Sequence, residues 1–517
     1  MLTSFSLLLC NRASPDGAWG LLYTPFSPQC IERPCMNWVW SRGVQQPRHG
    51  THESSNQAAG HPHPLRTREL AGLALLLLAA FATRLPWLSA GYGIDPDCSR
   101  VITAAQHIAR TGEYTSSRGP AYPVHEYMLS AVVGGGPVFT NGLSALFGCA
   151  AVLFFALILR RVGVTAYLLW ALAFAFVPVI FVNSVCTIDY VPALAFSLAS
   201  TYCLLSKWPV ASGVLLGLAI GTRVTSGAML LPLAIWGYLE NSKDRRVRDA
   251  LLLVMATLVA GSAAYLPAFL KYGTAFFAFA DWTVYPALQS VLLMGTKGVW
   301  GYSPGTVIGS LLLLLLVGGF LAFKSSTWRA GKHALIASGL VVVLYTIAFL
   351  RAPFEAGYLV PIVPFVLLGI VLLYPPKAQS LVAIALLPAF LLAPGENEVS
   401  RPGAIVNDHR IRMQKHELTL RIIDRANQLP PGSVVVVAWE LPQLLIYLEA
   451  RQQVEHPFVY FIEREEQMIE HQRLGHEVYY LEGLDYHNLQ AHAVDIVKFG
   501  ARPLFETDST HVAGNAS

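Results

Sequence analysis

The sequence contains few charged residues and few of the motifs that mark soluble enzymes. Only 13% of its 517 residues are charged, while 54% are hydrophobic. In a soluble domain about a quarter of the residues are charged. The low charged fraction therefore excludes an ordinary globular protein and indicates a membrane protein. A formal charge of +4 does not argue for nucleic acid, because the basic residues lie in short clusters between apolar runs.

Several site motifs are also missing. The chain has no Gly-x-Gly-x-x-Gly sequence, so no dinucleotide site is indicated. It has no Cys-x-x-Cys pair, which argues against a zinc or redox centre. The short apolar start lacks a basic flank and does not qualify as a signal peptide. The seven cysteines therefore predict core or incidental residues, at Cys10, Cys30, Cys35, Cys98, Cys149, Cys186 and Cys203.

Long apolar runs recur through most of the chain. A hydrocarbon core about 30 Å thick requires roughly 20 apolar residues in a helix, and about eleven segments approach that pattern. They span residues 69–89, 141–159, 165–182, 191–206, 210–221, 226–239, 250–270, 305–322, 333–350, 358–373 and 381–393. The fifth and sixth are short and are separated by Gly-Thr-Arg, so they form either two spans or one re-entrant pair.

Basic residues mark one alternating set of connecting loops. They are Arg66, Arg68, Arg160, Arg161, Lys207, Arg245, Arg246, Arg248, Lys324, Lys332 and Lys377. Because Lys and Arg collect on the cytoplasmic side, this alternation predicts a cytoplasmic N-terminus. An odd number of spans then places the C-terminus outside. We expect an integral, multi-pass protein of the plasma (inner) membrane.

The two ends of the chain differ from its apolar middle. Residues 1–66, rich in Pro, Ser, Gln and His, predict a disordered cytoplasmic extension rather than a metal-binding histidine tract. Residues 67–394 form the predicted membrane domain. Residues 395–517 are densely charged and predict a small exterior α/β domain with a parallel sheet. Its expected strands cover 433–439, 458–462 and 477–481, and its expected helices cover 441–451 and 463–474. Glu440 and Asp485, at strand ends, are either ligand-binding or solvated carboxylates.

The first exterior loop, residues 90–127, contains the most informative polar residues. Asp95 and Asp97 follow the first span, where one carboxylate can act as a general base or both can hold a divalent cation against a phosphate. Asp97 also lies where an N-cap is expected for a helix over 101–109, so capping is an equally good interpretation. Asp95 has no such role and is the stronger catalytic candidate. The start of that helix also favours phosphate.

The order of these features resembles the GT-C superfamily of membrane glycosyltransferases. They are an Asp-x-Asp loop after the first helix, a helix containing Ala105, Ile108 and Gly112, and an Arg-Gly-Pro-x-Tyr-Pro turn before a Gly-rich stretch. The superfamily includes protein O-mannosyltransferases and the bacterial aminoarabinose transferase of lipid A. The resemblance covers roughly residues 69–394 and implies that fold and a polyprenyl-phosphate sugar donor.

The resemblance also implies roles for loop residues. The family's loop aspartate, a catalytic base or metal contact, corresponds to Asp95 or Asp97. An acidic residue near the end of the family's loop corresponds to His125-Glu126, without the family's lysine. A divalent metal held by Asp95, Asp97 and Glu126 therefore stays open, and a solvated helix start is the alternative for His125 and Glu126.

Other exterior residues are candidates for binding the donor. Three arginines lie in predicted exterior loops, where the charge rule expects few basic residues: Arg118, Arg223 and Arg351. Arg118 precedes Tyr122 in the turn. The planar guanidinium group of arginine suits phosphate binding. Snorkelling or carbonyl capping explains any single one equally well. The stretch from Arg351 through Glu355 to Tyr358 resembles a family loop that meets the donor lipid.

Two further stretches have open interpretations. The pair Asp189-Tyr190, at the outer end of the fourth span, resembles a recurring family position, although helix capping predicts an aspartate there equally well. Trp282, Tyr285, Trp300 and Tyr302 in the loop over 271–304 suit either sugar faces or the interfacial belt. Such a loop can lie on the membrane as a lid.

Together these features predict a membrane glycosyltransferase. It would move a sugar from a polyprenyl-phosphate donor to a glycan, lipid or protein acceptor at the exterior face, with inversion. Membrane lipids are its other expected partners. The alternative is a secondary transporter or flippase of a lipid-linked or polar solute, because transporters place ionisable groups at broken helices and the break at 221–223 fits. A non-catalytic scaffold would leave the polar cluster from Asp95 to Glu126 unexplained.

Overall fold

The computed structural model describes most of the chain in detail. The described residues are 65–277, 288–325, 331–393, 401–402, 404–437, 458–460, 465–482 and 495–498. The predicted extension over 1–66 therefore lies outside the described residues except for its last two. The same holds for Trp282, Tyr285, Glu440, Asp485 and the expected helix over 441–451.

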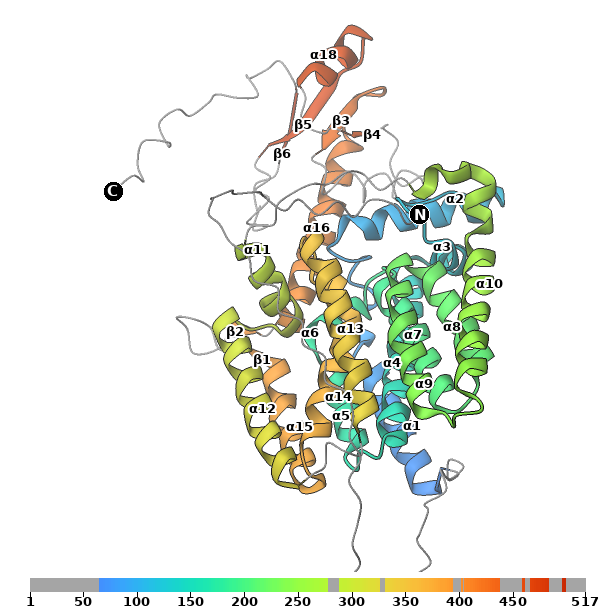
Figure 1. Ribbon diagram of the computed structural model, residues 1–517. Helices are drawn as coiled ribbons and strands as arrows, with labels where there is room; N and C mark the ends of the chain where they lie inside the picture. The colour runs from blue at the N-terminus through green and yellow to red at the C-terminus, as the bar shows by residue number, and fades with distance from the viewer. Residues whose placement is uncertain are drawn as a thin grey trace, which may run out of the picture. The chain divides into compact units, whose positions relative to one another are not determined.

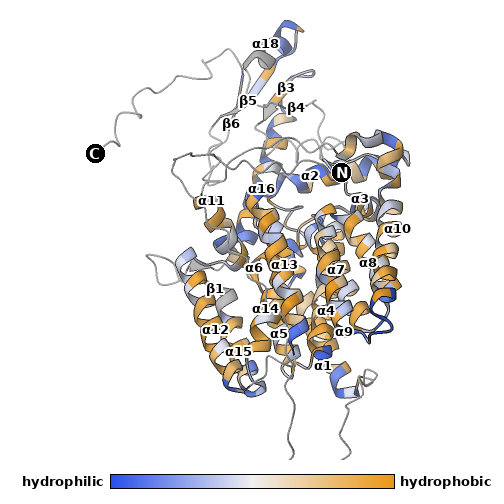
Figure 2. Ribbon diagram, in the orientation of Figure 1, coloured by the Kyte–Doolittle hydropathy of each residue, from blue (hydrophilic) through white to orange (hydrophobic). Residues whose placement is uncertain are grey.

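Helices occur at all of the predicted spans. They are α1 (Thr67–Ala82), α4 (Gly136–Arg161), α5 (Tyr167–Ala175), α6 (Pro178–Asn183), α7 (Tyr190–Leu205), α8 (Pro209–Thr222), α9 (Leu230–Glu240), α10 (Arg246–Tyr272), α12 (Pro304–Ser325), α13 (Lys332–Arg351), α14 (Val363–Leu373) and α15 (Pro376–Leu391). Figure 2 shows that apolar residues cover most of them. Six helical segments of the described chain are long and apolar enough to cross a bilayer, and α7 and α8 are shorter apolar helices. The chain is thus a polytopic α-helical membrane protein, while the count of eleven crossings stays a prediction.

The third predicted span is wrong as a single helix. α5 ends at Ala175, and α6 begins at Pro178. Proline has no backbone N–H and a fixed φ, so it begins a helix easily but cannot continue one. The fifth and sixth predicted segments are the short helices α8 and α9, joined by a 3-10 turn over Val224–Met229. Two spans and one re-entrant pair both stay open for them, because neither helix is among the six long enough to cross a bilayer.

Close helix packing positions the polar loops. α8 contacts both α7 and α10, and α4 contacts α7 (Figure 1). On α8, glycines recur every fourth residue at Gly213, Gly217 and Gly221. A Cβ atom added at any of them would lie 2.5 to 2.6 Å from an alanine Cβ of α10. Small residues therefore let these two backbones approach closely, as in membrane helix pairs.

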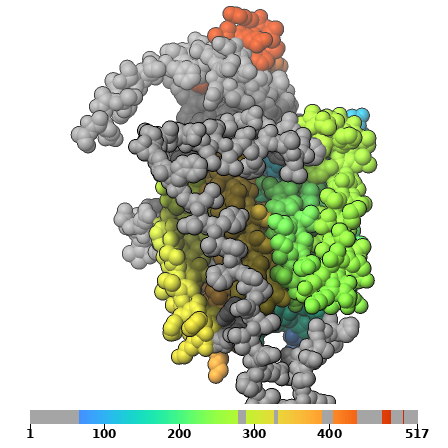
Figure 3. Space-filling view, in the orientation of Figure 1, coloured from blue at the N-terminus to red at the C-terminus, as the bar shows by residue number. Residues whose placement is uncertain are grey.

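Apolar side chains also cover the outer faces of the bundle. Along α12, Leu316, Phe320 and Phe323 are 71%, 67% and 85% exposed. Along α10, Val259 and Leu270 are 67% and 75% exposed. Figure 3 shows α12 in yellow and α10 in green along two sides of the face in view. Such surfaces are unfavourable in water and stable against lipid tails.

The C-terminal region contains the expected α/β elements. A long helix, α16 (Ala404–Ala426), precedes β3 (Val434–Val437), β4 (Phe458–Tyr460), α18 (Glu465–Arg473), β5 (Val478–Glu482) and β6 (Asp495–Lys498). The sheet order is β4-β3-β5-β6, with β3 parallel to both neighbours and β6 antiparallel to β5. The three predicted strands are thus present and parallel. The sequence pattern did not reveal β6 or α16.

Candidate active site

The acidic loop, residues 90–127, contains the helix α2 (Pro96–Thr111). Pro96 occupies the first helical position, so the helix begins five residues before the predicted start. The carboxylate of Asp95 accepts a hydrogen bond of 2.8 Å from the backbone N–H of Asp97. Asp95 is therefore the N-cap. The capping interpretation of Asp97 is wrong, and so is the expectation that Asp95 has no capping role, because the proline starts the helix earlier.

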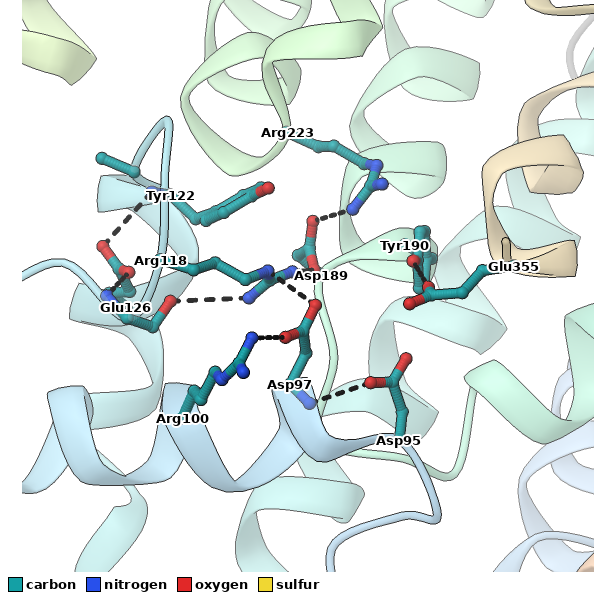
Figure 4. Close-up of polar contacts among 12 residues, drawn as sticks. Asp95, Asp97, Arg100, Arg118, Tyr122, Glu126, Asp189, Tyr190, Arg223 and Glu355 are labelled. Atoms are coloured by element: carbon teal, nitrogen blue, oxygen red, sulfur yellow. Dashed lines mark hydrogen bonds and ion pairs between the residues drawn. The ribbon is translucent and has the colours of Figure 1, made fainter. Parts of the chain in front are cut away.

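Three carboxylates converge beside this helix start. Asp95, Asp97 and Glu355 each offer one oxygen, and these oxygens all lie within 4.8 Å of one another. Glu355 comes from the segment between α13 and α14, directly before the 3-10 helix η7 (Ala356–Ile362). All three residues are half-buried, and Figure 4 shows Asp95 and Asp97 beside Glu355. We call them the acidic triad. Carboxylate oxygens at such spacing fit a hard divalent cation.

A buried ion network adjoins the acidic triad. Asp189, which is fully buried, accepts from Nη2 of Arg118 and from Nη1 of Arg223, each at 2.6 Å. Nε of Arg118 also lies 2.8 Å from Oδ2 of Asp97, while Oδ1 of Asp97 pairs with Arg100 at 3.0 Å. Two predicted phosphate-binding arginines are thus brought together by Asp189, which stands directly before α7 and makes no side-chain capping hydrogen bond. Figure 4 shows this arrangement.

Aromatic rings fix the two arginines of the network. The guanidinium of Arg118 lies 4.0 Å from the ring centre of Tyr122. That of Arg223 lies 4.0 Å from the ring of Tyr190 and 5.2 Å from that of Tyr358. The hydroxyl of Tyr190 donates a hydrogen bond to Glu355. Tyr190 therefore joins the ion network to the acidic triad, and cation–π contacts hold the guanidinium planes.

The two carboxylate environments shift pKa values in opposite directions. Burial raises the pKa of Asp95 to about 7, and the nearby charges of Glu355 and Asp97 add to this effect. Burial also opposes ionisation of Asp189. Arg223 and Arg118 more than offset it, so the pKa of Asp189 lies well below its ordinary value. Asp95 thus lies among like charges, whereas Asp189 lies between two guanidinium groups.

Glu126 lies outside the acidic triad. Its carboxylate accepts from the hydroxyl of Tyr114 at 2.6 Å and from the backbone N–H groups of Ser117 and Tyr122 at 2.7 and 3.3 Å. Burial raises its pKa. The tentative metal set of Asp95, Asp97 and Glu126 therefore changes in one member, because Glu126 is occupied in shaping its own loop and Glu355 takes its place.

His125 is buried near the ion network rather than solvated at a helix start. Its side chain is 1% exposed, and its Nδ1 atom has no hydrogen-bond partner among the described residues. Burial lowers the pKa of His125 to about 4, although Asp189 acts in the opposite direction. The solvated alternative for His125 and Glu126 is wrong for both, since both side chains are buried.

Arg351 is not part of the ion network. It is the last residue of α13, is exposed, and forms no ion pair with a described carboxylate.

The described chain includes two of the four candidate aromatic residues of the loop over 271–304. Trp300 is buried, and Tyr302 packs against the core. The sequence interpretation noted Asp189 and Tyr190 as a pair but placed neither among the predicted site residues. The available signal was an Asp-Tyr pair directly before an apolar helix.

Comparison with known proteins bears on the fold. ArnT from Cupriavidus metallidurans bound to undecaprenyl phosphate matches with a TM-score of 0.52 and 14% identity, over 80% of this chain and 93% of that one. Its apo state matches with a TM-score of 0.51 and 13% identity over the same shares. An oligosaccharyltransferase from Archaeoglobus fulgidus tethered with an acceptor peptide gives a TM-score of 0.45 and 12% identity, over 80% and 69%. No family model and no curated protein sequence matches the chain.

The likeness to the two ArnT structures bears on the fold of this chain alone. At such low identity the ArnT structures show a shared fold and not a shared substrate. The chain is a membrane protein with a GT-C-like fold, as the loop motifs predicted.

Proposed function

We propose that this protein is a glycosyltransferase that takes a sugar from a polyprenyl-phosphate donor. The observation that carries the proposal is the convergence of Asp95, Asp97 and Glu355, from two loops far apart in sequence, within a GT-C-like helix bundle. The ArnT structure of the same fold holds undecaprenyl phosphate. An acidic centre beside buried arginines suits a reaction that moves a proton and releases a phosphate.

Asp95 is the proposed base. One of its oxygens is held by the backbone of Asp97, and the other is left to accept the proton of an acceptor hydroxyl. A pKa near 7 suits a group that takes and releases a proton at neutral pH. Both oxygens of Asp97 face arginines, so Asp97 is better suited to orient the site. Attack by the acceptor on the anomeric carbon would invert its configuration.

The leaving group of this reaction is a lipid phosphate. Arg118 and Arg223 are already paired with Asp189, so their charge is largely compensated. Arg351 is exposed at the end of α13 and is the proposed phosphate contact, with Tyr358 nearby in the chain. A divalent cation held by the acidic triad would supply further positive charge.

Loop charge supports an exterior site. Lys and Arg residues gather in the loops at the other ends of the helices, which are cytoplasmic under the charge rule. The acidic loop, the acceptor and the C-terminal domain would then lie outside the plasma (inner) membrane. Sugar nucleotides are made in the cytoplasm, so this orientation favours a lipid-linked donor.

Asp95→Asn is the direct test. Purified protein in lipid nanodiscs would be given undecaprenyl-phosphate-linked hexoses and pentoses, and release of undecaprenyl phosphate would be measured. We expect the variant to lose about 100-fold or more in rate, as when a general base is removed. Glu113→Gln, an exposed carboxylate of the same loop, is the matched control. Full activity of Asp95→Asn would contradict the catalytic assignment.

Transport is the second candidate function. α8 ends at Thr222 and Arg223 adopts an extended conformation, so the helix path is broken beside a buried charge. That charge is neutralised by Asp189, which gives the break a structural explanation. Flux of a fluorescent polyprenyl phosphate across proteoliposomes, retained in Asp95→Asn, would favour transport instead.

A further inference from the structure

One face of α16 packs against the loops that carry the candidate active site. Ile405 joins a buried apolar cluster with Phe181 and Val185. One turn further, the ring of His409 lies 4.9 Å from that of Trp87 and makes an edge contact. Arg412 follows after about one more turn, and its side chain is almost fully buried. These residues follow the helical spacing of a single contact stripe.

Arg412 donates hydrogen bonds to two different loops. Its Nη2 atom lies 2.6 Å from the carbonyl oxygen of Val185 and 3.3 Å from that of Gly91. Gly91 stands four residues before Asp95, and Val185 stands four residues before Asp189. One guanidinium from the C-terminal region thus holds the backbone that leads to each of the two carboxylate clusters.

The two loops are also bonded to each other at this point. The N–H of Thr187 donates to the carbonyl oxygen of Tyr92 at 2.8 Å. Asn141 of α4 donates to the carbonyl oxygen of Gly91, also at 2.8 Å. Gly91 is therefore held from α4 on one side and from α16 on the other. Movement of Arg412 would reach both loops together.

The charge of Arg412 has weak local compensation. Asp408, one turn earlier, lies 3.7 Å away, and within the described chain Nε and Nη1 of Arg412 have no hydrogen-bond partner. A buried guanidinium whose main hydrogen bonds go to loop carbonyls holds those carbonyls in a fixed relation, because its planar fork is rigid. A lysine in its place would keep the charge and lose the fork.

We propose that Arg412 is a positioning residue that couples α16 of the C-terminal domain to both carboxylate loops of the candidate active site. Its effect on the rate rests on the proposed transferase function. Its effect on the loops does not. The C-terminal domain would therefore be needed to assemble the site, whatever acceptor it also meets.

The experiment compares Arg412→Ala, Arg412→Lys and the control Arg410→Ala in the full-length protein. Arg410 is exposed on the same helix. Hydrogen–deuterium exchange would be followed in peptides covering residues 88–99 and 183–190, with α4 peptides as an internal reference. We expect Arg412→Ala to exchange faster in both loops and α4 to stay protected, since loss of a tie opens local structure. Arg412→Lys should be intermediate and Arg410→Ala unchanged.

Kinetics with the undecaprenyl-phosphate-linked donor supply the second readout. Misplacement of reacting groups by about 1 Å costs up to about 100-fold in rate, so we expect a fall of about 10- to 100-fold in kcat for Arg412→Ala. KM for the donor should change by less than about threefold, because the hydrogen bonds of Arg412 go to the backbone that leads to the carboxylates and not to the proposed phosphate contact.

Each outcome separates the two proposals. Unchanged exchange in both loops would overturn the coupling. Faster exchange with an unchanged kcat would overturn the positioning role of Arg412 in the reaction. If the wild-type protein has no transferase activity and Arg412→Ala exchanges faster in both loops, the proposed function is overturned and the loop coupling stands. If Arg412→Ala does not fold, Arg412→Lys carries the same comparison.

Discussion

The acidic triad and the Asp189 ion network lie side by side, yet their charges are balanced in opposite ways. Asp189 is fully buried and meets two guanidinium groups at 2.6 Å. The acidic triad is half-buried. Asp97 is paired with Arg100 and Arg118, but Asp95 and Glu355 form no ion pair within the described chain. A buried aspartate held by two arginines belongs to a structural support, whereas carboxylates without an ion pair at a rim are available to a cation or substrate. Sequence types alone would not separate these two roles.

Removing Asp189 should produce the largest loss of stability. Asp189→Asn leaves Arg223 as a buried cation without its carboxylate and Arg118 with Asp97 alone. Breaking a buried pair in this way costs about 3–5 kcal/mol. Thermal unfolding in detergent would measure the effect. The comparison is with Asp95→Asn, for which we expect little loss, because Asp95 has like charges around it. Equal losses in both variants would remove the distinction between the two clusters.

His125 should make the ion network sensitive to acid. Its folded pKa of about 4 lies below the unfolded value of about 6.5, so the folded state disfavours the proton. Stability is then fully present above about pH 6.5 and falls as the pH drops toward 4, by about 2 kcal/mol at pH 5. The melting temperature of His125→Gln should therefore fall by less than that of the wild type between pH 7.5 and pH 5. His107→Gln, an exposed residue of α2, should behave as wild type, and identical pH curves for all three proteins would contradict the assignment.

Glu355→Gln should separate binding from stability in the acidic triad. We expect the affinity for Mn²⁺ to fall at least about tenfold, which is about 1.4 kcal/mol, since one of three oxygen ligands loses its charge. The melting temperature should stay the same or rise, because a repulsion between carboxylates is relieved. Calorimetric titration with MnCl₂ measures the affinity, and Glu126→Gln is the informative comparison. A loss of Mn²⁺ affinity in Glu126→Gln but not in Glu355→Gln would restore the metal set first suggested by the sequence.

The membrane fold could be predicted from the sequence because its signal is local. Apolar runs and loop charges identify helices one segment at a time, and every predicted span falls on a helix. Even the break between α5 and α6 is marked by Pro178, whose effect was overlooked. The parallel strands at 434–437 and 458–460 were likewise visible as short β-branched runs.

The membership of the site could be predicted only in part, because it depends on contacts between distant segments. Asp95 and Asp97 stand together in the chain, and loop position alone identified them. Their third partner was misassigned to the nearer Glu126. The local sequence does not distinguish a glutamate that accepts hydrogen bonds within its own loop from one that lies beside the carboxylates of a distant segment. Arg412 gave no signal at all, because a charged residue on a polar helix predicts a solvated face.

Tyr190 offers the smallest and most discriminating change, because it touches both clusters. Tyr190→Phe keeps the ring beneath Arg223 and removes only the hydroxyl that donates to Glu355. The loss of one hydrogen bond to a charged group should cost about 1.5–3 kcal/mol if that bond stabilises the fold. We expect less, about 1 kcal/mol or below, because Glu355 is half-buried and water can replace the donor. The Mn²⁺ affinity should then change by less than about threefold, since the oxygens of the triad stay in place. A tenfold loss of Mn²⁺ affinity with unchanged stability would instead mean that Tyr190 orients Glu355, and that the ion network acts on the acidic triad through this one hydroxyl.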